Sequence, residues 1–312
     1  EMCIRDSFNN KSFYGVEVES AGEIFTVEGK EAILSSGTIA NSQILLLSGI
    51  GPADELKEVG IKAIHDLPGV GKNFSDHPLI FITYGVKDGV KLDGLAPRLQ
   101  VGLRYTAEGS SRQNDMMVWM TSFATERVNR GGERMEPIGI RITCSVYIAD
   151  SKGEIKLVSS DPKEHPFLDF HLLEDPEDLR RMRESVRLAV DIFNDPAFAD
   201  MVSERIEPLD HDLENDEALN KWLQREVTTG QHLTGTCKMG PKTDPMAVVD
   251  QNLKIHGLDG IRVADASIMP ETVRANTNVT TISHDAFSSK AIMILHMTYN
   301  PCLLYTSDAA DE

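Results

Sequence analysis

Apolar and polar residues alternate along several stretches of the chain, as they do in β-strands. The strand candidates are residues 14–19, 23–36, 116–123, 140–148, 153–158 and 260–265. The second of these contains the apolar run Ala32-Ile33-Leu34, which is typical of a strand that enters a covered sheet. Between Ile140 and Ile148 every second residue is apolar, so we expect a half-buried strand with Cys144 in the core and Tyr147 on the opposite face. The candidates that follow Pro78 predict an antiparallel sheet in the middle of the chain.

Helical spacing and helix start signals predict five helices. The expected helices are residues 41–48, 54–59, 176–193, 216–227 and 279–297. Asp175 and Pro176 form a typical helix start, and apolar residues recur at helical spacing after them. The Gly49-Ile50-Gly51-Pro52 sequence is expected to end the first helix.

Charge and composition exclude several classes of protein. The 312 residues carry a net charge of -18 and contain no long basic run, which argues against binding to nucleic acid or to an anionic membrane surface. No apolar run is long enough to span a bilayer. The four cysteines have no metal-ligand spacing, so we expect no metal site and a reducing, cytoplasmic location.

The two ends of the sequence are related through their coding DNA. Residues 302–307 can be encoded by TGT CTC TTA TAC ACA TCT, and the reverse complement of that DNA, read from its third base, encodes residues 2–6. The shared element resembles a sequencing-library adapter. We therefore expect residues 1–7 and 302–312 to be adapter-like artefacts, and we exclude them from the interpretation of the fold.

The common catalytic motifs are absent from the sequence. There is no GxSxG, HExxH or Walker-type sequence. The Gly69–Phe74 loop lacks the third glycine of a dinucleotide fingerprint, and we interpret it as a structural turn. His232 lies among small residues, between Gly230 and Gly235, where an imidazole could accept a proton next to a ligand. Its spacing alone favours a structural role.

Five ordered blocks across residues 14–282 resemble the glucose-methanol-choline (GMC) family of flavin oxidoreductases. The similar segments are residues 37–52, 67–78, 231–250, 260–270 and 276–278. Asn41-Ser42 replaces the usual Ser-Pro of the first block, at a position where we expect a helix to begin and Asn or Ser to cap it. The resemblance implies FAD as cofactor and an alcohol as substrate.

The resemblance also implies roles for individual residues. His232 matches the catalytic histidine of the family, and Asn278 matches the second catalytic position. Oxidation of an alcohol needs a base, a hydrogen-bond donor for the developing alkoxide and a hydride acceptor, which is flavin N5. The remaining cofactor-binding residues implied by the resemblance are Asp265, Ala266, Asn276 and Thr281. Asp76 and His77 are expected to form a structural hydrogen-bonding pair, and Cys237 to be a packing residue.

The resemblance implies an α/β fold in which an incomplete, Rossmann-like FAD-binding domain is interleaved with an α+β substrate domain built on an antiparallel sheet. Residues 8–77 and 228–296 would belong to the FAD domain, and residues 78–227 to the substrate domain. The Gly-rich βαβ unit that holds the pyrophosphate would lie upstream, so we expect an internal or C-terminal fragment. The sequence departs from the family pattern after Thr281, and His284 is therefore not assigned a catalytic role.

Two alternatives to alcohol oxidation remain open at this point. One is an FAD-containing lyase of the same fold, of the hydroxynitrile lyase type, and the other is an inactive truncated fragment. The electron acceptor, oxygen or another compound, is not defined by the sequence. Met116, Met117, Trp119 and Met120 favour a non-sugar alcohol, although core packing explains them equally well.

Overall fold

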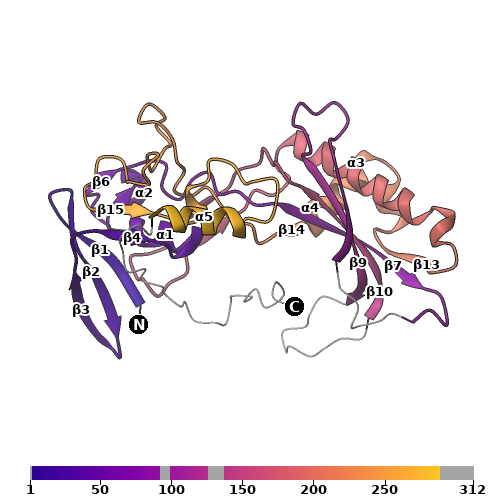
Figure 1. Cartoon of the computed structure of the whole chain (residues 1–312), viewed down its shortest axis with the longest axis horizontal. Coiled ribbons are helices and arrows are strands. Elements are labelled where there is room, and N and C mark those ends of the chain that lie inside the picture. Colours follow the sequence, from indigo (N-terminus) through magenta and orange to yellow (C-terminus); the bar gives the residue numbers. More distant parts are fainter. Residues whose placement is uncertain (1, 92–98, 126–136, 289–312) are drawn as a thin grey trace.

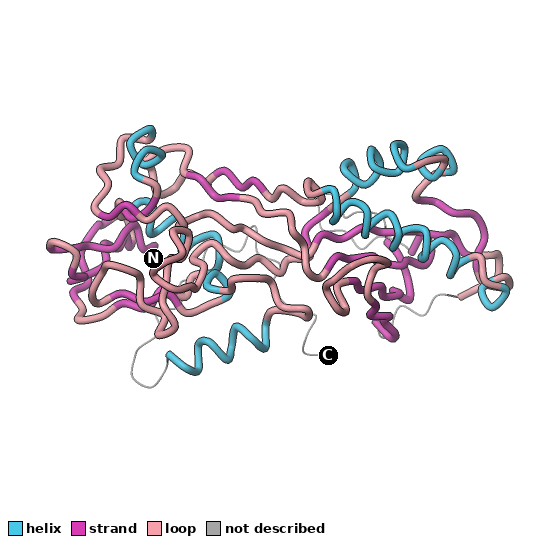
Figure 2. Tube along the Cα trace, turned by 90° about the horizontal axis from the view of Figure 1, so that it is seen from above, coloured by secondary structure: helices cyan, strands magenta, loops and turns pink. Residues whose placement is uncertain are grey.

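The computed structural model describes residues 2–91, 99–125 and 137–288, and it shows an elongated molecule (Figure 1). A small antiparallel sheet lies at one end, and a larger antiparallel sheet with a long helix lies at the other (Figures 1 and 2). Long loops connect the two ends (Figure 2). The mixture of helices and sheets agrees with the α/β class expected from the sequence.

The first end of the molecule combines segments from both ends of the sequence. Its early elements are β1 (Met2–Asn9), β2 (Ser12–Ser20), β3 (Glu23–Glu28), β4 (Ala32–Leu34), α1 (Gly37–Leu47), β5 (Ile50–Gly51), α2 (Ala53–Glu58) and β6 (His65–Asp66). Strands β1, β2 and β3 form an antiparallel sheet, whereas β4 pairs in parallel with the late strand β15 (Ile261–Val263). Their shared apolar core includes Leu34, Ile44, Leu45, Ile50, Val70, Cys237, Val248, Ile255, Val263 and Ile268.

The second end of the molecule has its own sheet and its own core. The sheet contains β7 (Pro78–Val86), β8 (Leu99–Tyr105), β9 (Met116–Thr125), β10 (Pro137–Val146) and β13 (Val202–Glu207), and β14 (Thr228–Thr229) pairs with β7. Helices α3 (Pro176–Phe193) and α4 (Asp216–Glu226) pack against this sheet (Figure 1). The core includes Ile80, Ile82, Met116, Val118, Ile142, Cys144, Met182, Val186, Phe193, Leu219 and Trp222.

Short elements complete the fold. They are β11 (Glu154–Lys156), β12 (Phe167–Asp169), the 3-10 turns η1 (Pro196–Phe198), η2 (Asp210–Leu213) and η3 (Ala266–Ile268), and α5 (Asn278–Ser288). The expected helix 279–297 extends past Ser288 into residues outside the described part of the chain. The adapter-like segment 302–312 lies entirely outside it. The expected start of α3 is confirmed, because the Asp175 side chain accepts a hydrogen bond from the backbone N–H of Glu177 at 2.8 Å.

The expected start of α1 at Asn41 is wrong. The helix begins at Gly37, and Asn41 is fully buried within it. The backbone N–H of Gly37 donates to Oδ2 of Asp265 at 2.7 Å, and the side-chain amide of Asn41 donates to the same oxygen at 2.7 Å. A carboxylate from the far end of the sequence thus satisfies the first turn of the helix, where local sequence suggested an Asn cap.

The expectation of a half-buried strand at residues 140–148 is also wrong. Cys144 is fully buried, as expected, but Thr143 and Ser145 on the opposite face are buried as well. Tyr147, which follows β10, is only 5% exposed. Alternation in the sequence therefore marked which face is apolar, but the polar face is covered too.

Candidate active site

A cavity of about 920 Å³ lies between the large sheet, the loop after β14 and the beginning of α5. Its described lining is Leu79, Leu99, Val101, Gly102, Met117, Trp119, Tyr147, Gly230, Gln231, His232, Asn276, Thr277, Asn278, Val279 and Thr281. Four residues predicted to act in the site, His232, Asn276, Asn278 and Thr281, therefore border one cavity. Another cavity, of about 910 Å³, lies beside β1, and the described residues around it include none of the predicted site residues.

The backbone around His232 is fixed by the carboxylate of Asp76. Oδ1 of Asp76 accepts hydrogen bonds from the backbone N–H of His232 at 2.9 Å and from that of His77 at 2.7 Å, and its Oδ2 accepts one from the Thr229 hydroxyl. Gly230 lies so close that a Cβ there would be 2.6 Å from the His77 carbonyl oxygen. Asp76 thus has the structural role expected of it, and His232 enters the cavity on a loop that is held in place.

The imidazoles of His77 and His232 contact each other through their Nδ1 atoms, which are 2.9 Å apart. Nε2 of the fully buried His77 lies 3.0 Å from the carbonyl oxygen of Val273, which can only accept a hydrogen bond. Nε2 of His77 is therefore assigned the proton, so that its Nδ1 accepts and His232 donates from Nδ1. This tautomer leaves Nε2 of His232 unprotonated, and that atom has no hydrogen-bond partner among the described residues.

Burial keeps both imidazoles neutral. It lowers the pKa of His77 to about 3, with the neighbouring His232 as the second cause. Burial also lowers the pKa of His232 from its usual value. Both rings are neutral at pH 7, so the assigned pair of tautomers is the form that operates near neutrality, and Nε2 of His232 can accept a proton there.

Tyr147 is a wall of the site that sequence reasoning missed. Its ring stacks on His77, with centroids 4.2 Å apart and planes inclined by 12°. Its backbone N–H donates to the carbonyl oxygen of Asp115 at 2.7 Å. The position of Tyr147 directly after an alternating strand carried no signal for this contact, because stacking joins segments that are distant in the sequence.

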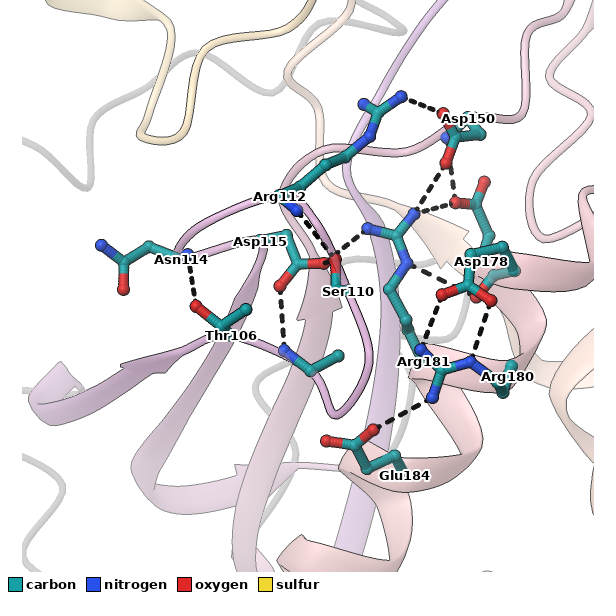
Figure 3. A network of polar contacts seen from close by, with 12 residues as sticks. Thr106, Ser110, Arg112, Asn114, Asp115, Asp150, Asp178, Arg180, Arg181 and Glu184 are labelled. Atoms are coloured by element: carbon teal, nitrogen blue, oxygen red, sulfur yellow. Dashed lines mark hydrogen bonds and ion pairs between the residues drawn. The ribbon is translucent and has the colours of Figure 1, made fainter.

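A buried ionic network anchors the loop that carries Asp115 (Figure 3). Arg181 of α3 lies between Asp115, at 2.8 Å, and Asp178, at 2.6 Å, and all three side chains are fully buried. Asp178 also accepts the backbone N–H groups of Asp150 and Ser151 at 2.9 and 2.7 Å. The network therefore ties α3 to the two loops that lead toward Tyr147.

Asp265 and Ala266, which were expected to bind the cofactor, do not border this cavity. The Asp265 carboxylate accepts hydrogen bonds from the backbone N–H and hydroxyl of Ser267 at 2.9 and 2.6 Å, in addition to those from α1. Burial raises the pKa of Asp265 despite these donors. The carboxylate thus joins the start of α1 to the turn η3 and orients the backbone of that turn.

The beginning of α5 presents hydrogen-bond donors to the cavity. Asn276, Thr277 and Asn278 border it, and Thr281 is fixed by a bond from its hydroxyl to the Thr277 carbonyl at 2.9 Å. The N–H groups of the first helical turn have no intrahelical acceptor, and side-chain amides lie beside them. Such a donor set suits an electron-rich carbonyl or ring edge, as in the flavin of FAD.

Solved structures with the same fold include two oxidases and an FAD-dependent oxidoreductase. Pyridoxine 4-oxidase from Mesorbium loti matches with a TM-score of 0.80 and 23% identity, over 92% of this chain and 56% of that chain. Formate oxidase matches with a TM-score of 0.80 and 23% identity, over 93% of this chain and 60% of that chain. An FAD-dependent oxidoreductase from Chaetomium thermophilum has a TM-score of 0.77 at 21% identity, over 92% and 60%. At these identities the likeness establishes the fold.

The chain belongs to the GMC oxidoreductase family of FAD-dependent enzymes, since family models described as GMC oxidoreductase match residues 3–79 and 149–284. It is 30% identical to the oxygen-dependent choline dehydrogenase of Photobacterium profundum over 305 residues, which are 91% of this chain and 54% of the relative. It is 34% identical to the oxygen-dependent choline dehydrogenase of Escherichia coli over 301 residues, which are 88% of this chain and 53% of the relative. The chain thus spans about half the length of the curated relatives it matches.

Within the described residues, no helix combines the length and the apolar composition needed to cross a membrane.

Proposed function

We propose that the full-length protein containing this chain oxidises the CH–OH group of an alcohol to an aldehyde or ketone. FAD, when bound, supplies the hydride acceptor. Family membership supports this reaction class, and the His77–His232 contact is the observation that carries the assignment of the base. Choline, which the names of the relatives give as their substrate, is the reference alcohol against which other alcohols are compared.

In this proposal Nε2 of His232 takes the proton of the substrate hydroxyl. His77 accepts the Nδ1 proton of His232 and so holds the ring in the tautomer whose free lone pair is on Nε2. Asn278 donates a hydrogen bond to the substrate oxygen as negative charge develops on it. Asn276, Thr281 and the first N–H groups of α5 would hold the flavin, and the turn at Asp265 and Ala266 would contribute backbone N–H groups to it.

We also propose that residues 8–77 and 228–296 form the FAD-binding part and residues 78–227 the substrate part. The two separate apolar cores support this division, since one combines early and late segments and the other contains only residues of the middle segment. The cavity that His232 borders is lined by residues of both proposed parts.

The test is flavin reduction in the full-length protein. Anaerobic mixing with an alcohol substrate should bleach the flavin absorbance, and His232→Ala should slow this by about 10²-fold or more because the general base is lost. His211→Ala, which removes an exposed histidine outside the cavity, is the matched control and should leave the rate unchanged. A protein without flavin, or a flavin that no alcohol bleaches, contradicts the proposal.

A further inference from the structure

One wall of the cavity is apolar and aromatic. Met117 and Trp119 lie two residues apart on β9 and so face the same side of the sheet. Leu79 and Tyr147 border the cavity beside them, and the Trp119 and Tyr147 rings are 6.4 Å apart. The described lining contains no Asp or Glu side chain. A positively charged substrate group would therefore meet aromatic faces but no described counter-charge.

Arg104 lies on the same face of the sheet, next to this wall. The register of β8 and β9 places Gly102 opposite Trp119 and Arg104 opposite Met117. Directly opposed residues of antiparallel strands share a face, so Arg104 follows the cavity-lining positions in sequence and in space. Its guanidinium carbon lies 5.6 Å from the centroid of the Tyr147 ring.

Among the residues that the structure describes, none neutralises the charge of Arg104. No carboxylate of the described residues forms an ion pair with it, whereas Arg112 pairs with Asp150 and Arg181 with Asp115. The carboxylate nearest to the histidine pair, that of Asp76, is occupied by the loop amides and the Thr229 hydroxyl.

The net charge of -18 draws cations to the molecule as a whole, but salt screens that field within about 10 Å. The Arg104 guanidinium is exposed and is screened by salt too, so it acts on a bound group only at contact distance. The positive charge of Arg104 therefore decides whether the bound substrate is preferred as an anion or as a cation. Its effect is opposite to that of the negative net charge of the molecule.

We propose that the cavity takes an alcohol with an apolar or aromatic body and a carboxylate at its far end, and that Arg104 binds this carboxylate and disfavours a fixed cation such as a trimethylammonium group. This inference rests on the proposed function, because it names the substrate class of the same site. Arg104 is the residue that determines the charge preference, while His232 and Asn278 act on the hydroxyl end.

The test uses three benzyl alcohols that differ only in their para group: carboxylate, methyl and trimethylammonium. The dissociation constants of the matching unreactive toluene derivatives for the full-length flavoprotein are measured by calorimetry, and flavin bleaching by the three alcohols is followed separately. The carboxylate should bind at least about tenfold more tightly than the trimethylammonium compound at low salt, and the difference should shrink as salt is added.

Two variants separate local from overall charge. Arg104→Glu should reverse the order of affinities, and Arg187→Glu, which makes the same charge change at an exposed position of α3, should leave the order intact. Equal or tighter binding of the trimethylammonium compound to the unaltered protein, or an order that Arg104→Glu does not change, overturns the inference. Absence of bleaching with all three alcohols contradicts the proposed oxidation instead, because the binding order is read without turnover.

Discussion

Nδ1 of His77 lies 2.9 Å from Nδ1 of His232, so one of these two nitrogens donates a proton to the other. Because His77 is committed through Nε2 to the Val273 carbonyl, that proton belongs to His232. The buried ring thus determines which nitrogen of the half-buried ring can act as a base. Metal-ligating histidines are oriented by their second nitrogen in the same way.

Replacement of His77 should impair His232 without removing it. In His77→Ala, water can reach Nδ1 of His232, both tautomers become populated, and the pKa of His232 should rise toward its usual value because burial is what lowers it. The acid limb of the flavin-reduction rate should therefore move to higher pH, and the rate at neutral pH should fall by about tenfold or more. The measurement is the pH profile of anaerobic flavin reduction.

His77→Asn provides the matched control, because its amide oxygen can accept the Nδ1–H of His232 from a similar position. This variant should recover most of the rate and the original pH limb. If the alanine and asparagine variants lose activity equally while the pH limb stays in place, His77 acts only by filling space.

Arg181 and Arg180 are neighbours on α3 with different expected contributions to stability. Arg181→Met should lower the free energy of unfolding by about 3–5 kcal/mol, because it leaves the buried carboxylates of Asp115 and Asp178 without their cation. Arg180→Met removes partly exposed pairs with Glu177 and Glu184 and should change it by about 1 kcal/mol or less. Urea unfolding of both variants gives the comparison, and equal losses would contradict this account of the network.

Asp6 occupies an inward position on β1, opposite Val16, and neither oxygen of its buried carboxylate has a hydrogen-bond partner. Burial raises its pKa to about 7. A strand position suited to an apolar side chain therefore holds a carboxyl group, within a strand that the family model for residues 3–79 includes. Asp6→Val should therefore increase the free energy of unfolding by on the order of 2 kcal/mol at pH 8.

The pH dependence of this gain has a definite sign. The folded carboxyl group keeps its proton up to a pH of about 7, whereas the unfolded one loses it near 3.8, so the stability of the unaltered chain falls as the pH rises between these values. The advantage of Asp6→Val should thus be largest above pH 7 and smallest below pH 4. Arg5→Val, at the exposed neighbouring position, should have little effect at any pH; a gain from Asp6→Val that is independent of pH would show that the carboxylate is not the cause.

Elements with a strong local pattern were predictable. The apolar spacing and the Asp175 cap defined α3, and the alternation after Ile140 identified β10 and the buried Cys144. The start of α1 was not predictable, because its cap is Asp265 from the other end of the chain. Of the six predicted site residues, His232, Asn276, Asn278 and Thr281 border one cavity, while Asp265 and Ala266 do not. The catalytic roles of these residues remain predictions.

The sequence by itself determined the family, the antiparallel middle sheet and the identity of His232 as a candidate base, because periodicity and ordered motifs are local properties of a chain. Only the tertiary structure decided that His77 orients His232, that Tyr147 stacks behind this pair and that Arg104 lies beside the cavity without a described counter-ion. Each of these relationships joins residues from different segments. Burial, tautomer and charge balance depend on which segments pack together, and spacing along the chain does not specify that.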